Sequence, residues 1–148
     1  MTAPGDFSSG DVLTAADMNA LPGGMMGNAT NSSPARLTAS AQTYATVTFT
    51  AVSGRMYRAI GQLYATGPDA AGELVGWLVC DGTRRGQSAT YFDTTDNEAG
   101  ISCIAIFTGS GSFTVNFQAL GADGVTDAYV ENFQGIDPFL VVEDIGPS

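Results

Sequence analysis

Few side chains in this sequence could do chemistry, and the densest group of them is acidic. Asp93, Asp96 and Glu98 lie in one short segment, and their oxygen atoms would suit Ca²⁺. The spacing does not match an EF-hand loop, and acidic clusters between strands are usually solvated, so we expect no metal there. The other carboxylates form no recognisable local pair for glycoside hydrolysis, although a pair assembled by the fold would not be visible in a sequence.

The chain of 148 residues contains no histidine and no lysine. The missing histidine excludes an imidazole general base, a Ser-His or Cys-His nucleophile pair and a His-ligated zinc. The missing lysine excludes a Walker-type phosphate loop and Schiff-base chemistry. We therefore expect a non-enzymatic protein that needs no cofactor. A small glycan-active enzyme is the least favoured alternative, because it lacks any motif.

The charge balance is strongly acidic. Five arginines face fifteen Asp and Glu residues, so 5 − 15 gives a net charge of −10. Nucleic-acid binding needs clustered basic residues, and an anionic membrane surface attracts them, so we expect neither partner. The chain has no apolar run long enough for a transmembrane helix and no signal-peptide pattern, which predicts synthesis and folding in a cytoplasm.

The arginines are the candidate charge contacts. Arg84 and Arg85 form the only basic pair, near a predicted hairpin tip, where they could bind a carboxylate or simply be solvated. Arg55 and Arg58 fall on opposite faces of a predicted strand. In so acidic a chain, we expect at least one of these two to contact a carboxylate, within the chain or across an interface.

Cys80, Cys103 and Trp77 all lie within apolar runs. The two cysteines could form a disulfide or remain buried free thiols, and the apolar surroundings favour free thiols. For Trp77, the same surroundings favour a place in the core over a role as a platform for a sugar.

From about residue 37 onward the hydrophobic pattern is that of β-strands. Ala45, Val47 and Phe49 alternate with threonines, which predicts a half-buried strand. Similar runs, separated by Gly, Asp and Ser turns, predict about eight strands, at 44–50, 55–65, 74–81, 87–92, 101–108, 113–118, 127–133 and 139–144. Short strands at this spacing indicate an all-β domain over residues 37–148, an antiparallel, jelly-roll-like β-sandwich.

The first 36 residues have a different character. Residues 1–24 are predicted to form an anchoring arm with a short helix, which Thr14 caps and Pro22 ends. Residues 25–36 are polar and Gly-rich, and we expect a flexible linker there. So short a helix is not stable alone, so the arm's apolar residues must dock on a partner or on their own domain. These residues are Phe7, Val12, Leu13, Met18 and Leu21.

The predicted arm contains a sequence motif that resembles a pattern in a known group of proteins. Gly-Asp-Val-Leu-Thr-Ala-Ala-Asp-Met-Asn, at residues 10–19, resembles an N-terminal pattern of tailed-bacteriophage virion proteins, notably head decoration and minor tail proteins of actinobacterial phages. Residues 23–27, 47–58 and 139–147 resemble segments of the same proteins. The resemblance implies a non-enzymatic β-domain that forms a homotrimer and is held to the particle by its N-terminal segment.

The expected function follows from both arguments. We expect an oligomeric capsid decoration protein, with the major capsid protein or another virion protein as partner and the capsid exterior as its location. The five apolar arm residues would bind the shell, and the arginines would contact acidic partners. The alternative is a minor tail or tail-fibre protein with a receptor- or carbohydrate-binding β-domain. The chain has no long fibre shaft, which favours decoration.

Overall fold

The computed structural model describes residues 21–30, 35–66, 71–92, 98–123, 125, 128–130 and 137–148. Every regular element within these residues is a β-strand. None of the described residues belongs to a helix long and apolar enough to cross a membrane. The predicted helix after Thr14, and most of the predicted arm, lie outside this part of the chain.

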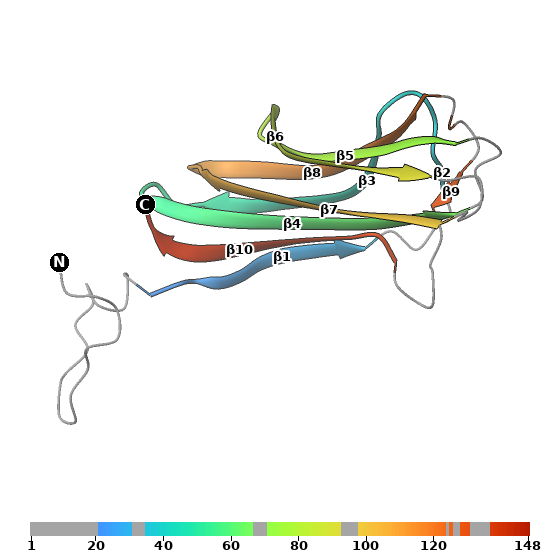
Figure 1. The fold of residues 1–148 in the computed structure, drawn as a ribbon. Helices are drawn as coiled ribbons and strands as arrows, with labels where there is room; N and C mark the ends of the chain where they lie inside the picture. The colour runs from blue at the N-terminus through green and yellow to red at the C-terminus, as the bar shows by residue number, and fades with distance from the viewer. Residues whose placement is uncertain are drawn as a thin grey trace, which may run out of the picture.

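In the part of the chain that the structure describes, ten strands form two antiparallel sheets, packed face to face as a sandwich (Figure 1). Sheet A has the path β1-β10-β4, continued at one end of β4 by β9 and β2, and β7 pairs with the other side of β4. Sheet B has the order β3-β8-β5-β6. The strands of sheet A are β1 (Gly24–Thr30), β2 (Ala35–Arg36), β4 (Arg55–Thr66), β7 (Glu98–Thr108), β9 (Tyr129–Val130) and β10 (Phe139–Pro147). Those of sheet B are β3 (Gln42–Ala51), β5 (Gly72–Cys80), β6 (Thr83–Phe92) and β8 (Gly111–Ala122).

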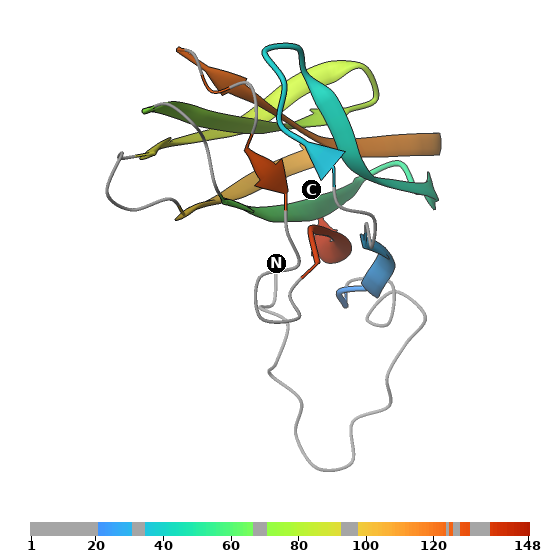
Figure 2. The ribbon, with the colours of Figure 1, turned by 90° about the vertical axis from the view of Figure 1, so that its right-hand side faces the viewer.

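The core lies between the two sheets, where the alternation of each strand directs its apolar side chains. β3 buries Ala45, Val47 and Phe49 and exposes the threonines between them. Four aromatic rings, those of Phe49, Tyr57, Phe107 and Phe113, form a closed cluster in which each ring contacts two others, with centroids 5.0 to 5.9 Å apart. Figure 2 looks along the strands and shows the two layers that enclose this core.

Two glycines set the geometry around β6. Asp81 and Gly82 both have positive φ angles, 47° and 77°, which makes them the two-residue turn of the hairpin between β5 and β6. Gly86 has φ 54° at a register shift, and a Cβ there would collide with the carbonyl oxygen of Ile104. The bulge at Gly86 therefore brings the edge of sheet B close against β7 of sheet A.

The predicted β-sandwich is confirmed, and a strand occurs in each of the eight predicted segments. The linker expected at residues 25–36 differs from the structure, because Met25 to Thr30 belong to β1 and Ala35 and Arg36 form β2. The physical reason is tertiary: β1 hydrogen-bonds along β10 and places Gly27 and Ala29 over the core, so pairing overrides a polar, Gly-containing sequence.

Candidate functional site

The most highly organised polar group in the described residues lies where the predicted arm joins the sandwich. β1 begins at the same end of the sandwich as the C-terminus, at the left in Figure 1. There, Arg55 of β4 binds Asp144 of β10 through two hydrogen bonds, Nε to Oδ2 at 2.6 Å and Nη2 to Oδ1 at 2.8 Å. Nη2 of Arg55 also donates to the carbonyl oxygen of Leu21 at 2.6 Å. We call Leu21, Gly23, Arg55, Asp144 and Gly146 the arm joint.

Asp144 is almost completely enclosed within the arm joint. Its side chain is 7% exposed and that of Arg55 is 14% exposed. The amide of Gly146 donates to Oδ1 at 3.0 Å, and the amide of Gly23 also bonds the carboxylate. Burial by itself raises the pKa of Asp144, but the hydrogen bonds and charge of Arg55 and the two amides lower this pKa below its usual value. The carboxylate therefore stays ionised and binds the start of β1 to the end of β10.

Glycine at position 23 is required by this geometry. A Cβ there would lie 2.6 Å from Oδ2 of Asp144. Leu21 is the predicted arm residue within the described region, and its side chain is exposed while its carbonyl is held by Arg55. Phe7, Val12, Leu13 and Met18 lie outside the described residues.

A second ion pair lies one residue along β10, on the opposite face of sheet A. Nη2 of Arg58 donates to Oε2 of Glu143 at 2.6 Å, with the two side chains 44% and 34% exposed. The prediction that Arg55 or Arg58 contacts a carboxylate is therefore confirmed for both, within the chain. The further expectation that these two arginines contact an outside partner has no support from this geometry, because each already has a carboxylate.

Arg84 covers the single tryptophan. Its guanidinium carbon lies 3.6 Å from the centroid of the Trp77 ring, and Nε1 of Trp77 donates to Oε1 of Gln118 at 3.1 Å. Trp77 is buried, as predicted, but it belongs to the outer face of sheet B and not to the core between the sheets. Because Arg84 occupies one face of the indole ring, that face is not offered to a ligand.

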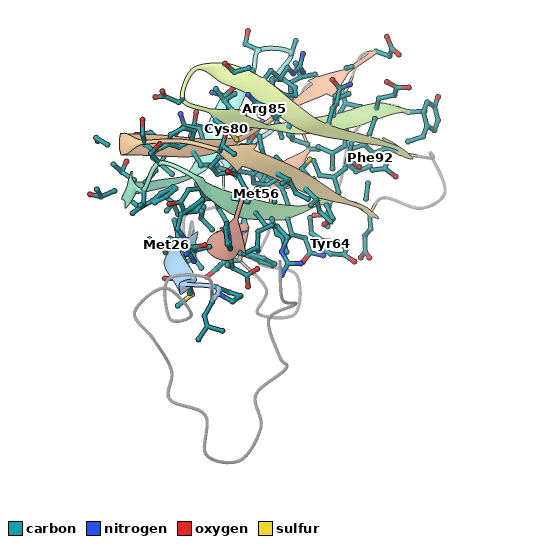
Figure 3. All side chains as sticks on the ribbon, turned by 90° about the vertical axis from the view of Figure 1, so that its left-hand side faces the viewer. Met26, Met56, Tyr64, Cys80, Arg85 and Phe92 are labelled. Atoms are coloured by element: carbon teal, nitrogen blue, oxygen red, sulfur yellow. The ribbon has the colours of Figure 1, made fainter. Side chains whose placement is uncertain are left out.

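Arg84 and Arg85 belong to β6 itself and not to the turn that precedes it. Arg85 is exposed and pairs across the strands with Leu78, and its side chain makes no hydrogen bond or ion pair with the described residues. Figure 3 shows Arg85 on the opposite side of the molecule from Tyr64 of sheet A. Arg85 is thus the predicted arginine that remains available to an outside carboxylate.

The cysteines and acidic residues add no reactive centre within the described part of the chain. Cys80 and Cys103 are free and buried, as predicted, and burial raises the pKa of each thiol to about 11. No group of three or more possible metal ligands occurs among the described residues. Glu98 is exposed at the start of β7, whereas Asp93 and Asp96 of the predicted calcium cluster lie outside the described residues.

The outer face of sheet B is polar and uncharged along β3 and β8. Oγ1 of Thr46 donates to Oδ1 of Asn116 at 2.8 Å, and the hydroxyls of Thr48 and Thr114 are hydrogen-bonded at 3.1 Å. These cross-strand pairs satisfy one another and form a flat hydrophilic surface.

Comparisons with known proteins support the architecture. The structure is similar to Eiger TNF from S. frugiperda, with a TM-score of 0.51 and 9% identity over 84% of this chain and 95% of that chain. The fold is a jelly-roll sandwich. At this identity the likeness concerns the fold alone, and a fold of this kind hosts many functions.

Weaker likenesses have TM-scores below one half. The insecticidal delta-endotoxin Cry8Ea1 from Bacillus thuringiensis matches with a TM-score of 0.45 and 12% identity, over 76% of this chain and 20% of that one. A carbohydrate-binding module, CBM36 in complex with calcium and xylotriose, matches with a TM-score of 0.40 and 12% identity, over 79% and 92% of the two chains. No protein-family model and no curated protein matches the sequence.

Proposed function

We propose that this chain is a non-enzymatic structural protein of a tailed-phage particle. In this proposal it is an oligomeric capsid decoration protein, expected as a trimer, that attaches to the head through its N-terminal arm and displays the sandwich outward. Its partners are further copies of itself and the major capsid protein or another virion protein.

The arm joint is the observation that supports this proposal most strongly. An anchor must transmit force to the domain that it holds, so the point where it leaves the domain needs a firm connection. Arg55 and Asp144 provide one, because they bind the main chain at Leu21 and Gly23 with charge-assisted hydrogen bonds in a largely buried site.

The sequence of the predicted arm adds two supports. Residues 10–19 carry the motif that resembles virion proteins, and they precede the arm joint directly. Apolar residues such as Val12 and Leu13 are suited to bind a shell, since burying apolar side chains against a partner lowers the free energy.

The tail alternative remains the second location to test. In that case the β-domain would bind a receptor or a carbohydrate. The usual aromatic platform for a sugar is not offered by Trp77, whose ring is covered by Arg84. Tyr91 is an exposed aromatic ring on the outer face of sheet B, at 63% exposure, and is the place where a sugar could stack.

Deletion of residues 2–20 tests the attachment. This deletion leaves Leu21 and Gly23 in place, so the arm joint and the sandwich keep their contacts. We expect a folded domain with an unchanged melting temperature that no longer binds particles lacking the protein, as measured by co-sedimentation. Retained binding would contradict anchoring through the arm.

Point variants of the full chain sharpen the same test. Val12→Asp with Leu13→Asp places two charges on the proposed docking residues, and Ser8→Asp with Ser9→Asp adds the same charge at neighbouring polar positions. We expect the first variant to lose particle binding and the second to keep it. Equal loss in both would mean that charge alone, and not apolar contact, governs attachment.

A further inference from the structure

The outer face of sheet A carries an apolar patch that no described residue covers. Ile104 and Ile106 of β7 are 57% and 56% exposed, although both are large apolar side chains. Strand pairing places Ile60 of β4 beside Ile104, and Val141 of β10 beside Ile60. Three branched apolar residues therefore form one continuous row across three strands.

The neighbouring row has apolar ends and a charged centre. Ile106 pairs with Arg58, Arg58 with Glu143, and Glu143 with Met25 of β1, which is 65% exposed. Because Arg58 and Glu143 neutralise each other, the two rows together carry no net charge. We call these two rows the sheet A patch.

The charge of the chain restricts what can cover this patch. Each copy carries a net charge of −10, so two copies repel each other over most of their surfaces. The sheet A patch is apolar and neutral, and there two copies can approach without placing like charges together. The polar threonine surface of β3 and β8, on the outside of sheet B, would contribute much less favourable free energy on burial, because it is not apolar.

We propose that the sheet A patch is the contact surface between copies of this chain. The two rows are self-complementary across the sheet. When the β7 side of one copy packs on the β1 side of another, Ile106 meets Met25, and the neutral Arg58–Glu143 pair of one copy lies against the same pair of the other. In a twofold pair the two sides of each copy meet the other copy in a single interface, whereas in a ring of three they belong to two different interfaces. This inference rests on the proposed function only in that both require self-association.

The solution mass of the full chain tests the surface. We expect sedimentation to give a multiple of the 15.2 kDa chain mass, three by the proposed function or two for a twofold pair. Ile104→Asp with Ile106→Asp should yield a monomer with unchanged circular dichroism. Ala89→Asp with Tyr91→Asp adds the same two charges to exposed positions of β6, on the outside of sheet B, and should leave the mass unchanged.

A milder variant keeps the test valid if the aspartates prevent folding. Ile104→Thr with Ile106→Thr retains β-branched side chains on β7 and should shift the equilibrium toward monomer. A monomeric wild type, or an unchanged mass in both β7 variants, would overturn the proposal.

Cysteine cross-linking tests which strands meet. Met25 and Ile106 lie three strand spacings apart in one copy, roughly 14 Å, beyond the Cα separation that a disulfide can bridge. Met25→Cys with Ile106→Cys should therefore form disulfides only between copies. Thr43→Cys with Gln87→Cys is the matched control, since these residues end the corresponding four-strand row of sheet B.

We expect oxidation to give covalent dimers or trimers for the sheet A pair and only background for the sheet B pair. Equal cross-linking in both pairs would overturn the proposed contact. Particle binding by the arm is measured separately, so an oligomer that binds particles but keeps its mass in both β7 variants would contradict this inference alone. A monomeric wild type would contradict this inference and the oligomeric state in the proposed function together. An oligomer that binds no particle would contradict the proposed function alone.

Discussion

Replacing Arg55 with methionine removes the cation of the arm joint and keeps most of the side-chain volume. Asp144 then remains buried with two amides as its remaining donors, those of Gly146 and Gly23. The carbonyl of Leu21 loses its hydrogen bond from Arg55 at the same time. The variant therefore tests whether the joint stabilises the fold at the base of the arm.

We expect a large loss of stability in this variant because the Arg55–Asp144 pair is largely shielded from water, with the two side chains 14% and 7% exposed. Removing one partner of a buried ion pair costs about 3 to 5 kcal/mol, and we expect the lower end, about 3 kcal/mol, since the two amides remain. For a chain of this length, that loss corresponds to a fall in melting temperature of roughly 6 to 12 °C. Asp144→Asn should lose less, about 2 kcal/mol, and the double variant should lose less than the sum.

The stability lost on replacing Arg55 should decrease as the pH falls. The pKa of Asp144 in the folded protein lies below its ordinary value of 3.8. The stability from this carboxylate is therefore fully present above pH 3.8 and is lost as the pH falls through the lower, folded-state pKa. The difference between wild type and R55M should be largest at pH 7 and should narrow in acid.

The assay is urea unfolding at pH 7 and pH 3, with every variant made in the Ile104→Asp, Ile106→Asp chain, because Arg58 lies in the sheet A patch and self-association affects apparent stability. Arg58→Met is the matched control. It breaks the neighbouring pair on the same two strands, which is much more exposed and should contribute at most about 1 kcal/mol. If R55M and R58M lost equal stability at pH 7, the argument from burial would be refuted.

Three further predictions concern other parts of the sandwich. Gly86→Ala should lower the free energy of unfolding by about 2 to 4 kcal/mol, measured by urea unfolding, because it strains a positive φ and collides with the Ile104 carbonyl. Cys80 and Cys103, with thiol pKa values of about 11, should resist alkylation at pH 8 in the native protein and react after unfolding, as mass spectrometry can count. Arg84→Ala should uncover Trp77, which would shift its fluorescence to longer wavelength and increase quenching by acrylamide at a stability cost of roughly 0.5 to 1 kcal/mol. An unchanged spectrum in that variant would show that Arg84 does not cover the ring in solution.

The strand alternation explains why so much of the fold could be predicted. In β3, every second residue is apolar, and this pattern determines both the strand and its buried face. β1 could not be predicted in this way, because Gly24-Met25-Met26-Gly27 does not alternate. That segment becomes a strand through its pairing with β10, which lies more than a hundred residues later.

The contacts of the arm joint could likewise be predicted only in part. The sequence predicted that Arg55 or Arg58 contacts a carboxylate, but the partners lie 89 and 85 residues away, and only the β4–β10 register brings them together. The sequence did contain one indication of the role of Asp144. In a strand, Asp144 lies on the same face as the apolar residues Leu140 and Val142, and that face is buried. A buried carboxylate needs a cation nearby. Trp77 was assigned to the core because β5 is apolar on both faces, and alternation gives no information in such a run.

Immunogold labelling of purified particles tests the central claim most directly. An antibody against residues of the exposed outer face of sheet B, such as Thr48 and Tyr91, would leave both the arm and the sheet A patch untouched. We predict many labels per particle, distributed over the head and absent from particles assembled with the chain that lacks residues 2–20. Label confined to the tail would replace decoration with the tail alternative, and purified particles that carry none of the protein would contradict a virion structural role.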